Sequence, residues 1–196
     1  TRGTTRGDGI AGADVTANLR TIRPIPLRLN ALGQADAPGV LEVRGEVIMT
    51  RSGFALLNRE RTDADEPLFA NPRNATAGSL KQLDSALVAR RPLDIVLYGS
   101  GEIIGGPMID SQSGLLDALS RLGFRTPQHT WCCSGVDDVL DAIAELDRVR
   151  PRFDYYTDGA VIQLNRFALR DRIRAHAKAP RWAMAYKSAP DHNQTK

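Results

Sequence analysis

The sequence predicts an α+β fold for a domain that occupies the whole chain, residues 1–196. Hydrophobic residues make up 42% of the chain and charged residues 25%, a balance typical of a globular protein with a sizeable core. Segments with strand periodicity and segments with helix periodicity follow one another without a regular β-α-β alternation. This irregular order favours α+β over a doubly wound parallel sheet.

The first half of the chain is expected to contain one strand and two helices. Residues 41–49 alternate between apolar and charged side chains, as in a strand with one covered face. A helix is expected next, with Ser52 as its N-cap. A second helix is expected to begin at Asn71, because Pro72 suits a first turn, and to run to about Leu83.

The second half is expected to contain three strands and three helices. The short apolar run at residues 94–98 predicts a buried strand, and two amphipathic helices follow it. We expect the helices at residues 114–122, 137–148 and 167–175 (the last one short and basic), and the closing strands at residues 160–165 and 182–187.

Composition limits the partners and the compartment. The apolar runs are too short to cross a bilayer, so no membrane partner is expected. The net charge of +3 is compatible with a polyanionic partner but does not establish one. Cys132 and Cys133 are adjacent, a spacing that rarely forms a disulfide and cannot make a four-ligand zinc site. They predict two reduced thiols in a cytoplasmic protein, with no zinc in this chain.

Two segments in the first fifty residues carry charge in a distinctive pattern. At residues 5–9, glycines beside Arg6 allow a tight turn that brings a guanidinium close to a phosphate. Taken alone, the segment is better explained as a surface turn. On the first strand, Glu42, Arg44 and Glu46 share a face that is either solvated or one wall of a polar cleft. Gly45 favours the cleft, because glycine in a strand often marks a close approach.

The second expected helix carries a row of spaced cations. Arg73, Ala77 and Lys81 lie on one stripe, and eight residues at ~1.5 Å each separate the two cations by ~12 Å. This span suits two nearby phosphates of a nucleic-acid strand. An ordinary solvated helix face is the alternative.

The last expected strand ends in a lysine. Ala183, Ala185 and Lys187 share one face, and two small side chains leave room for a flat ligand whose phosphate the lysine could meet. A lysine at a strand end is more often simply exposed, so periodicity alone does not define a site.

Taken together, these segments resemble the adenylation domain of NAD-dependent DNA ligases of the bacterial type. The matching motifs are TRGDG, LEVRGEV, FANPRN with AGSL and QLD, DGAVIQLN, and APRWAMAYK, which follow in order from residue 5 to residue 187. The resemblance implies a nucleotidyltransferase (ATP-grasp-like) fold, with antiparallel sheets and flanking helices around a nucleotide cleft.

The resemblance also implies a reaction in DNA repair and replication. A lysine attacks the α-phosphorus of the AMP half of NAD and releases nicotinamide mononucleotide. The AMP then passes to a 5′-phosphate at a nick in duplex DNA, and the neighbouring 3′-hydroxyl displaces it. NAD is therefore a substrate, Mg²⁺ is the expected cofactor, and a monomer is expected.

Residue by residue, the resemblance divides the site into three parts. Arg6, Glu46 and Gln163 would contact the adenylate. Arg150 and Lys187 would bind phosphate, and Arg73 and Lys81 would bind DNA. We expect Asp158 and Lys187 to be the catalytic residues, and Glu46 and Asp158 to hold magnesium.

The chain departs from the family at several positions. The nucleophile of the family lies in a Lys-x-Asp-Gly motif that precedes TRGDG, and this chain is expected to lack that part of the domain and to be inactive alone. The family usually has lysine at Gln163, arginine at Lys81, and an aromatic residue with proline after Lys187. Gln163 can still hydrogen-bond adenine but supplies no charge.

Two rival interpretations stay open. A non-catalytic nucleotide- or nucleic-acid-binding remnant of a ligase would explain Gln163 and the Ser188-Ala189 change. An ATP-using ligase or a capping-type nucleotidyltransferase would share the lysine chemistry, but the run from FANPRN to QLD resembles the NAD users alone.

Overall fold

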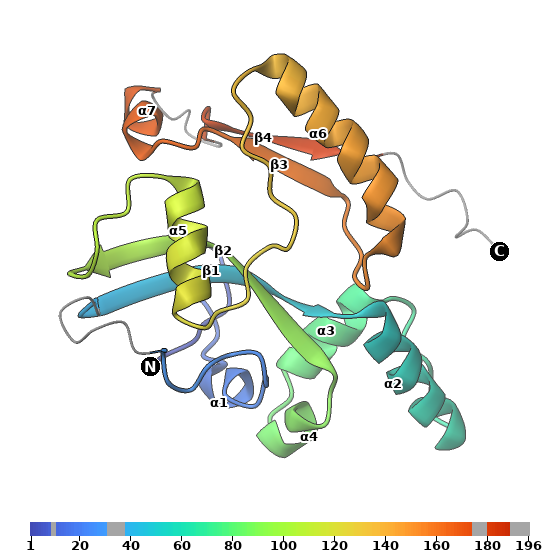
Figure 1. The fold of residues 1–196 in the computed structure, drawn as a ribbon. Coiled ribbons are helices and arrows are strands. Elements are labelled where there is room, and N and C mark those ends of the chain that lie inside the picture. The colour runs from blue at the N-terminus through green and yellow to red at the C-terminus, as the bar shows by residue number, and fades with distance from the viewer. Residues whose placement is uncertain (9–10, 31–37, 174–179, 189–196) are drawn as a thin grey trace.

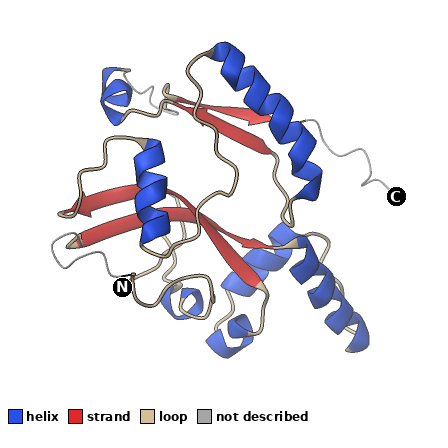
Figure 2. Cartoon of the chain, viewed as in Figure 1, coloured by secondary structure: helices blue, strands red, loops and turns tan. Residues whose placement is uncertain are grey.

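The computed structural model describes residues 1–8, 11–30, 38–173 and 180–188. Two antiparallel two-stranded sheets and their flanking helices form a mixed fold, which confirms the α+β prediction (Figures 1 and 2). The elements are α1 (Thr16–Leu19), β1 (Val40–Met49), α2 (Arg51–Asp63), α3 (Pro72–Leu80), α4 (Ser85–Ala89), β2 (Leu93–Ile104), α5 (Gln112–Arg121), α6 (Val136–Val149), the 3-10 helix η1 (Arg150–Arg152), β3 (Gly159–Gln163), α7 (Phe167–Arg172) and β4 (Ala183–Lys187).

The first sheet is a long ribbon of β1 and β2. Met49 pairs with Leu93 at one end and Val40 with Ile104 at the other, so β2 extends well beyond the predicted residues 94–98. The extra length follows from the partner, because each strand supplies the hydrogen bonds that the other needs. Leu93, Ile95 and Leu97 alternate into the core.

Gly45 lies at an irregularity in the β1–β2 register, between Arg44 and Gly45. A Cβ atom at Gly45 would collide with the carbonyl oxygen of Val96 and with the side chain of Leu97. The close approach that glycine permits is therefore made by β2, not by a ligand. The expectation that Gly45 indicates a cleft is wrong in this respect.

The hydrophobic core follows one face of the ribbon in two clusters. One cluster lies among the ribbon, α2, α3 and α4, and the other between the ribbon and α5. Ile25 and Val47 contact both clusters, so the core is continuous. The buried members are Ile22, Met49, Leu57, Ala75, Val88 and Leu93 in the first cluster and Ile95, Leu97, Leu115 and Leu119 in the second.

Side-chain caps set where α2 and α3 begin and end. The N-cap of α2 is Thr50, whose hydroxyl accepts from Gly53, and not Ser52 as predicted. Asn71 caps α3 as expected. The helix ends at Leu80 rather than near Leu83, and the Asn18 side chain donates to the carbonyls of Leu80 and Gln82, both at 2.8 Å. These bonds satisfy carbonyl groups that the helix leaves unpaired.

The second sheet, β3 with β4, lies beside α6 (Figure 1). Tyr186 of β4 donates a hydrogen bond to Asp147 of α6 at 2.9 Å, and the Ser188 hydroxyl donates to the same carboxylate. Residues 174–175, the end of the predicted basic helix, lie outside the described residues. Sequence periodicity did not indicate the short helices α1, α4 and η1.

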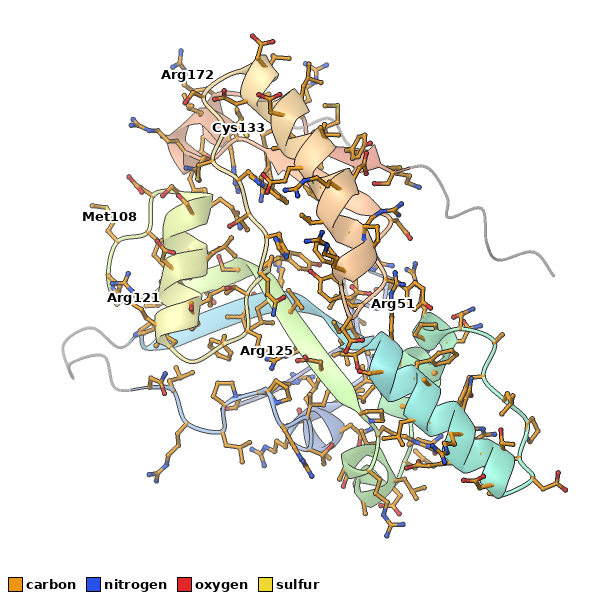
Figure 3. All side chains as sticks on the ribbon, turned by 45° about the vertical axis from the view of Figure 1, so that its right-hand side comes forward. Arg51, Met108, Arg121, Arg125, Cys133 and Arg172 are labelled. Carbon is orange, nitrogen blue, oxygen red and sulfur yellow. The ribbon has the colours of Figure 1, made fainter. Side chains whose placement is uncertain are left out.

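Polar contacts join the second sheet to the first at two places. The Asp154 carboxylate accepts from the backbone and the hydroxyl of Ser52 in the first turn of α2, across 102 residues of sequence. Arg51, labelled in Figure 3, places its guanidinium 4.3 Å from the centre of the Tyr156 ring. At the other end, Asn165 accepts from the backbone of Gln112 at 2.9 Å.

No helix among the described residues is long and apolar enough to cross a membrane.

Gly45→Ala is expected to lower the free energy of unfolding by ~1–3 kcal/mol, because the methyl group forces the two strands apart. Thermal unfolding of the purified chain measures the change. Gly99→Ala is the matched control, since the added carbon there meets only the Cβ of Arg44 at 3.9 Å. Equal losses in both variants would contradict the account of the β1–β2 contact.

Ser52→Ala is expected to raise the pKa of Asp154. Hydrogen bonds from the side chain and then the backbone of Ser52 hold this pKa below its ordinary value, with a smaller contribution from the Arg51 charge. Because the folded-state pKa is lowered, the contact stabilises the protein above the ordinary carboxyl pKa and is lost as the pH falls through the folded value. Carboxyl NMR titration measures the shift, and Asp14 serves as a control that should not move.

Candidate functional site

Arg6 lies in a hairpin-like loop at the start of the chain. Thr4 pairs with Asp14, and the backbone of Thr5 donates to Ala13 at 2.9 Å. Gly7 has a φ of 57°, a conformation that glycine adopts easily and that lets the chain reverse directly after Arg6. The Arg6 side chain is exposed. An open hollow of about 460 Å³ lies beside this loop, lined by Arg2, Thr4, Ala11 and Gly12.

Glu46 is exposed on the face of β1 opposite the core. Its neighbour Val47 packs into both core clusters, so strand alternation turns Glu46 away from them. Arg44 and Glu42 are exposed too, and they form an ion pair of 2.9 Å. The charged face of β1 is therefore present as predicted. Hydrogen bonds from the Arg44 side chain and the Glu102 backbone lower the pKa of Glu42.

Asp158 and Lys187 lie together at one end of the second sheet. Gly159, which follows Asp158, pairs with Lys187, and the carbonyl of Asp158 accepts from the backbone of Ser188 at 2.9 Å. The Thr157 hydroxyl donates to the carbonyl of Gly159 at 2.8 Å and holds the turn into β3. The side chains of Asp158 and Lys187 are both exposed.

The two faces of the second sheet differ. Tyr186 bonds to Asp147 of α6, so alternation turns Ala183, Ala185 and Lys187 to the opposite face. Val161 of β3 pairs with Ala185 on that face and is 66% exposed. The face is therefore a row of small and medium side chains that ends in a cation. This is the arrangement that the sequence predicted.

Arg150 begins η1, directly after α6, and its side chain is half-buried. Its charge acts on the phenol of Tyr186. The hydrogen bond to Asp147 raises the pKa of Tyr186 most strongly, and Arg150 opposes this shift. Arg150 follows three residues after Asp147, the α6 residue that accepts from Tyr186.

Gln163 lies at the other end of the second sheet and contacts Arg170 of α7. The Arg170 Nη2 donates to the Oε1 of Gln163 at 3.4 Å and to that of Gln112 at 3.2 Å. The Arg170 guanidinium lies 4.3 Å from the centre of the Trp182 ring and 4.7 Å from that of Phe167. Burial lowers the pKa of Arg170 from its ordinary value. The sequence does not single out Arg170, since an arginine on a basic helix carries no signal of its own.

Arg73, Ala77 and Lys81 are all exposed, whereas Ala75, Thr76 and Ser79 of the same helix are buried. The predicted stripe on α3 is therefore exposed to solvent. No ion pair occupies Arg73 or Lys81 among the described residues.

The predicted site residues thus occupy four parts of the fold. Lys187 and Gln163 lie on the second sheet, with Asp158 directly before β3 and Arg150 directly after α6. Glu46 lies on β1, Arg6 in the first loop, and Arg73 and Lys81 on α3 and at its end. Within the described ranges, no three His, Cys, Asp or Glu side chains are grouped so that they could hold a metal ion.

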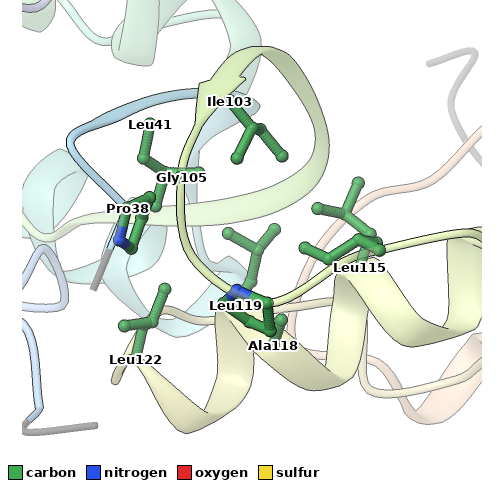
Figure 4. Close-up of a pocket in the computed structure, with 10 residues that line it drawn as sticks. Pro38, Leu41, Ile103, Gly105, Leu115, Ala118, Leu119 and Leu122 are labelled. Atoms are coloured by element: carbon green, nitrogen blue, oxygen red, sulfur yellow. The ribbon is translucent and has the colours of Figure 1, made fainter. Parts of the chain in front are cut away.

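A small apolar cavity between the ribbon and α5 is too small for a nucleotide (Figure 4). Its volume of about 20 Å³ admits little more than one water-sized probe. Leu41, Ile103, Leu115 and Leu119 are among its lining residues.

Comparison with known proteins agrees with the motifs. The chain is 43% identical to DNA ligase 1 of Opitutus terrae over 99% of its own length and 29% of the relative's. DNA ligases of Methylacidiphilum infernorum and Desulforudis audaxviator are 45% and 47% identical over 99% of this chain, which is 28% of each relative. The chain therefore spans under a third of these relatives. Residues 1–191 match the family described as the NAD-dependent DNA ligase adenylation domain, and the chain belongs to that family.

Proposed function

We propose that the chain is the nucleotide-handling part of a DNA ligase that seals nicks with NAD as its AMP donor, and that it has the nucleotidyltransferase fold. The observation that carries the proposal is the open face of β3–β4. This face has Lys187 next to Asp158 at one end and Gln163 at the other, and small or medium side chains line the rest. A flat ligand can approach such a face without displacing side chains, and its phosphate then meets a cation at the end.

The proposed reaction divides the work among the named residues. A lysine forms a bond to the α-phosphorus of NAD while the bond to nicotinamide mononucleotide breaks. Arg150 and Lys187 balance the charge on the phosphate that is transferred. Asp158 directly precedes Gly159, the residue that pairs with Lys187, and acts at the same end of the site. Arg6, Glu46 and Gln163 bind the adenosine part.

The attacking lysine is not in this chain. Its lysines are Lys81, Lys178, Lys187 and Lys196, and none stands before an x-Asp-Gly sequence. Lys187 occupies the position of a phosphate-binding lysine rather than that of the nucleophile. We therefore propose that the chain is inactive alone and that the nucleophile comes from elsewhere in the ligase.

The described residues do not form a complete binding site for Mg²⁺ by themselves. Glu46 lies on β1 and Asp158 directly before β3, and the described residues form no group of three metal-binding side chains. Protein sites for Mg²⁺ often combine one or two carboxylates with phosphate oxygens of the substrate. We assign no step to the metal.

Gln163 favours a second candidate function, a nucleotide- or nucleic-acid-binding remnant of a ligase without activity. The family usually has a charged lysine there, and an amide is neutral. This candidate predicts nucleotide binding by a protein that never ligates.

Incubation of the chain with NAD and Mg²⁺ is expected to leave its mass unchanged, because no nucleophilic lysine is present. Intact-protein mass spectrometry checks the outcome. Lys187→Ala is the matched control and should give the same result. A single AMP adduct that disappears in Lys187→Ala would show that Lys187 is the nucleophile and that the assignment is wrong.

Lys81→Ala is expected to slow nick sealing and weaken binding of nicked DNA in the full-length ligase that contains this chain. The slope of binding against salt should fall by about 1, because one phosphate contact is lost. Adenylation from NAD should change less, since that step involves no DNA.

Arg90→Ala is the matched control for Lys81→Ala, because Arg90 is an exposed cation on the neighbouring helix end. Equal ligation rates and equal salt slopes in wild type and Lys81→Ala would support an ordinary solvated helix face instead.

A further inference from the structure

The Gln163 side chain is held in one orientation by a chain of hydrogen bonds that begins on the first sheet. Gln112 is buried, and its Nε2 donates to the carbonyl oxygen of Tyr98 on β2 at 2.7 Å. Its Oε1 is thereby turned toward Arg170, whose Nη2 donates to it at 3.2 Å. The same Nη2 donates to the Oε1 of Gln163 at 3.4 Å. Each glutamine amide is therefore oriented by a group that it bonds to: Gln112 by the carbonyl of Tyr98, and Gln163 by Arg170.

The chemistry of the guanidinium decides which end of the Gln163 amide faces it. An arginine has only donors, so the amide atom beside Arg170 must be the oxygen and not the nitrogen. The NH₂ group of Gln163 therefore points away from Arg170. Within the described part of the chain, the Nε2 of Gln163 has no hydrogen-bond partner, which leaves this donor available to a ligand.

Arg170 itself is fixed on several sides. Its Nε donates to the carbonyl of Leu164 at 2.7 Å, and the rings of Trp182 and Phe167 lie close to its guanidinium. Stacking on two aromatic rings restricts a guanidinium and adds cation–π attraction. Nothing in the described residues forms an ion pair with it. The hydrogen bonds of Arg170 therefore orient the neighbouring amide groups and do not pair its charge with a carboxylate.

Gln163 and Lys187 lie at opposite ends of the open face. Lys187 pairs with Gly159, four residues before Gln163, so the two positions are about 13 Å apart along the strands at ~3.3 Å per residue. If Lys187 meets the phosphate of a nucleotide, Gln163 is placed to meet its base.

We propose that Arg170 is a positioning residue that sets base specificity, because it fixes Gln163 with its NH₂ group directed at an acceptor nitrogen of adenine. The inference rests on the proposed nucleotide site. A lysine at position 163 would present only donors and needs no orientation, whereas a free glutamine can present either a donor or an acceptor. Arg170 thus gives the glutamine the donor-only character that lysine has by itself.

The site is then expected to distinguish nucleotides by the hydrogen-bonding edge of the base. In adenine the ring nitrogen next to the amine-bearing carbon accepts a hydrogen bond, whereas in hypoxanthine the same nitrogen carries a hydrogen. A fixed donor favours adenine and meets hypoxanthine donor to donor. A site with an unmatched polar group discriminates strongly against the wrong ligand.

The test compares AMP with inosine monophosphate by NMR titration of the 196-residue chain. The wild type should prefer AMP by about tenfold, the upper end of what one hydrogen bond between neutral groups contributes. In Arg170→Gln the preference should fall toward equality. Gln163→Lys in the Arg170→Gln background should restore it, because lysine is a donor without help. Gln163→Lys alone should weaken binding, since it places a second cation against Arg170.

Gln163→Lys is thus expected to weaken binding in the wild type and to restore the preference for AMP in Arg170→Gln. This opposite effect distinguishes a positioning role of Arg170 from a role in the stability of the fold. A lysine at position 163 replaces none of the bonds that Arg170 makes to Leu164 and Gln112, so it cannot rescue a purely structural loss. Arg172→Gln is the matched control on the same helix, exposed and expected to be neutral. Arg170→Lys and thermal unfolding report any loss of folding separately.

The outcomes are distinct. An unchanged preference in Arg170→Gln, or no restoration by Gln163→Lys in the double variant, overturns the role of Arg170 and leaves the nucleotide site intact. If the wild type binds neither nucleotide, the proposed nucleotide site fails, and the inference fails with it.

Discussion

The pairing of β1 with β2 is the constraint on which the rest of the structure depends. A two-stranded ribbon is marginally stable alone, so its apolar face must be covered. Leu93, Ile95 and Leu97 line that face, and the helices that cover it form both parts of the core. The opposite face keeps Glu46 and its charged neighbours exposed. The hydrogen bonds between β1 and β2 thereby determine which side chains enter the core and on which face Glu46 lies.

The second sheet is attached to this framework by polar groups and by Phe167 of α7, which packs against the second core cluster. At one end, Asp154 accepts a hydrogen bond from Ser52, and at the other, the carbonyl of Asn165 accepts one from Gln112. Each bond contributes modest net stability. An attachment of this kind positions β3–β4 without covering its open face.

The glutamine at position 163, where the family usually has lysine, is interpreted differently from the sequence and from the structure. In sequence it is the loss of a charge from a ligase motif, which favours a binding remnant. In the structure, the amide lies against a guanidinium held by Trp182 and Phe167. The donor function of the missing lysine can then reside in a pair of residues, which is compatible with a ligase that is active as a whole.

The sequence by itself determined the faces of the elements and the family. The alternation in β1, the exposed row from Arg73 to Lys81 and the small residues before Lys187 all appear as predicted, because periodicity encodes which side chains share a surface. Only the tertiary structure decided which polar side chains contact one another. Asn18 at the end of α3, Asp154 on Ser52 and Arg170 between two glutamines join residues far apart in the chain. A polar side chain carries no local pattern that names its partner, so these contacts exist only once the chain has folded.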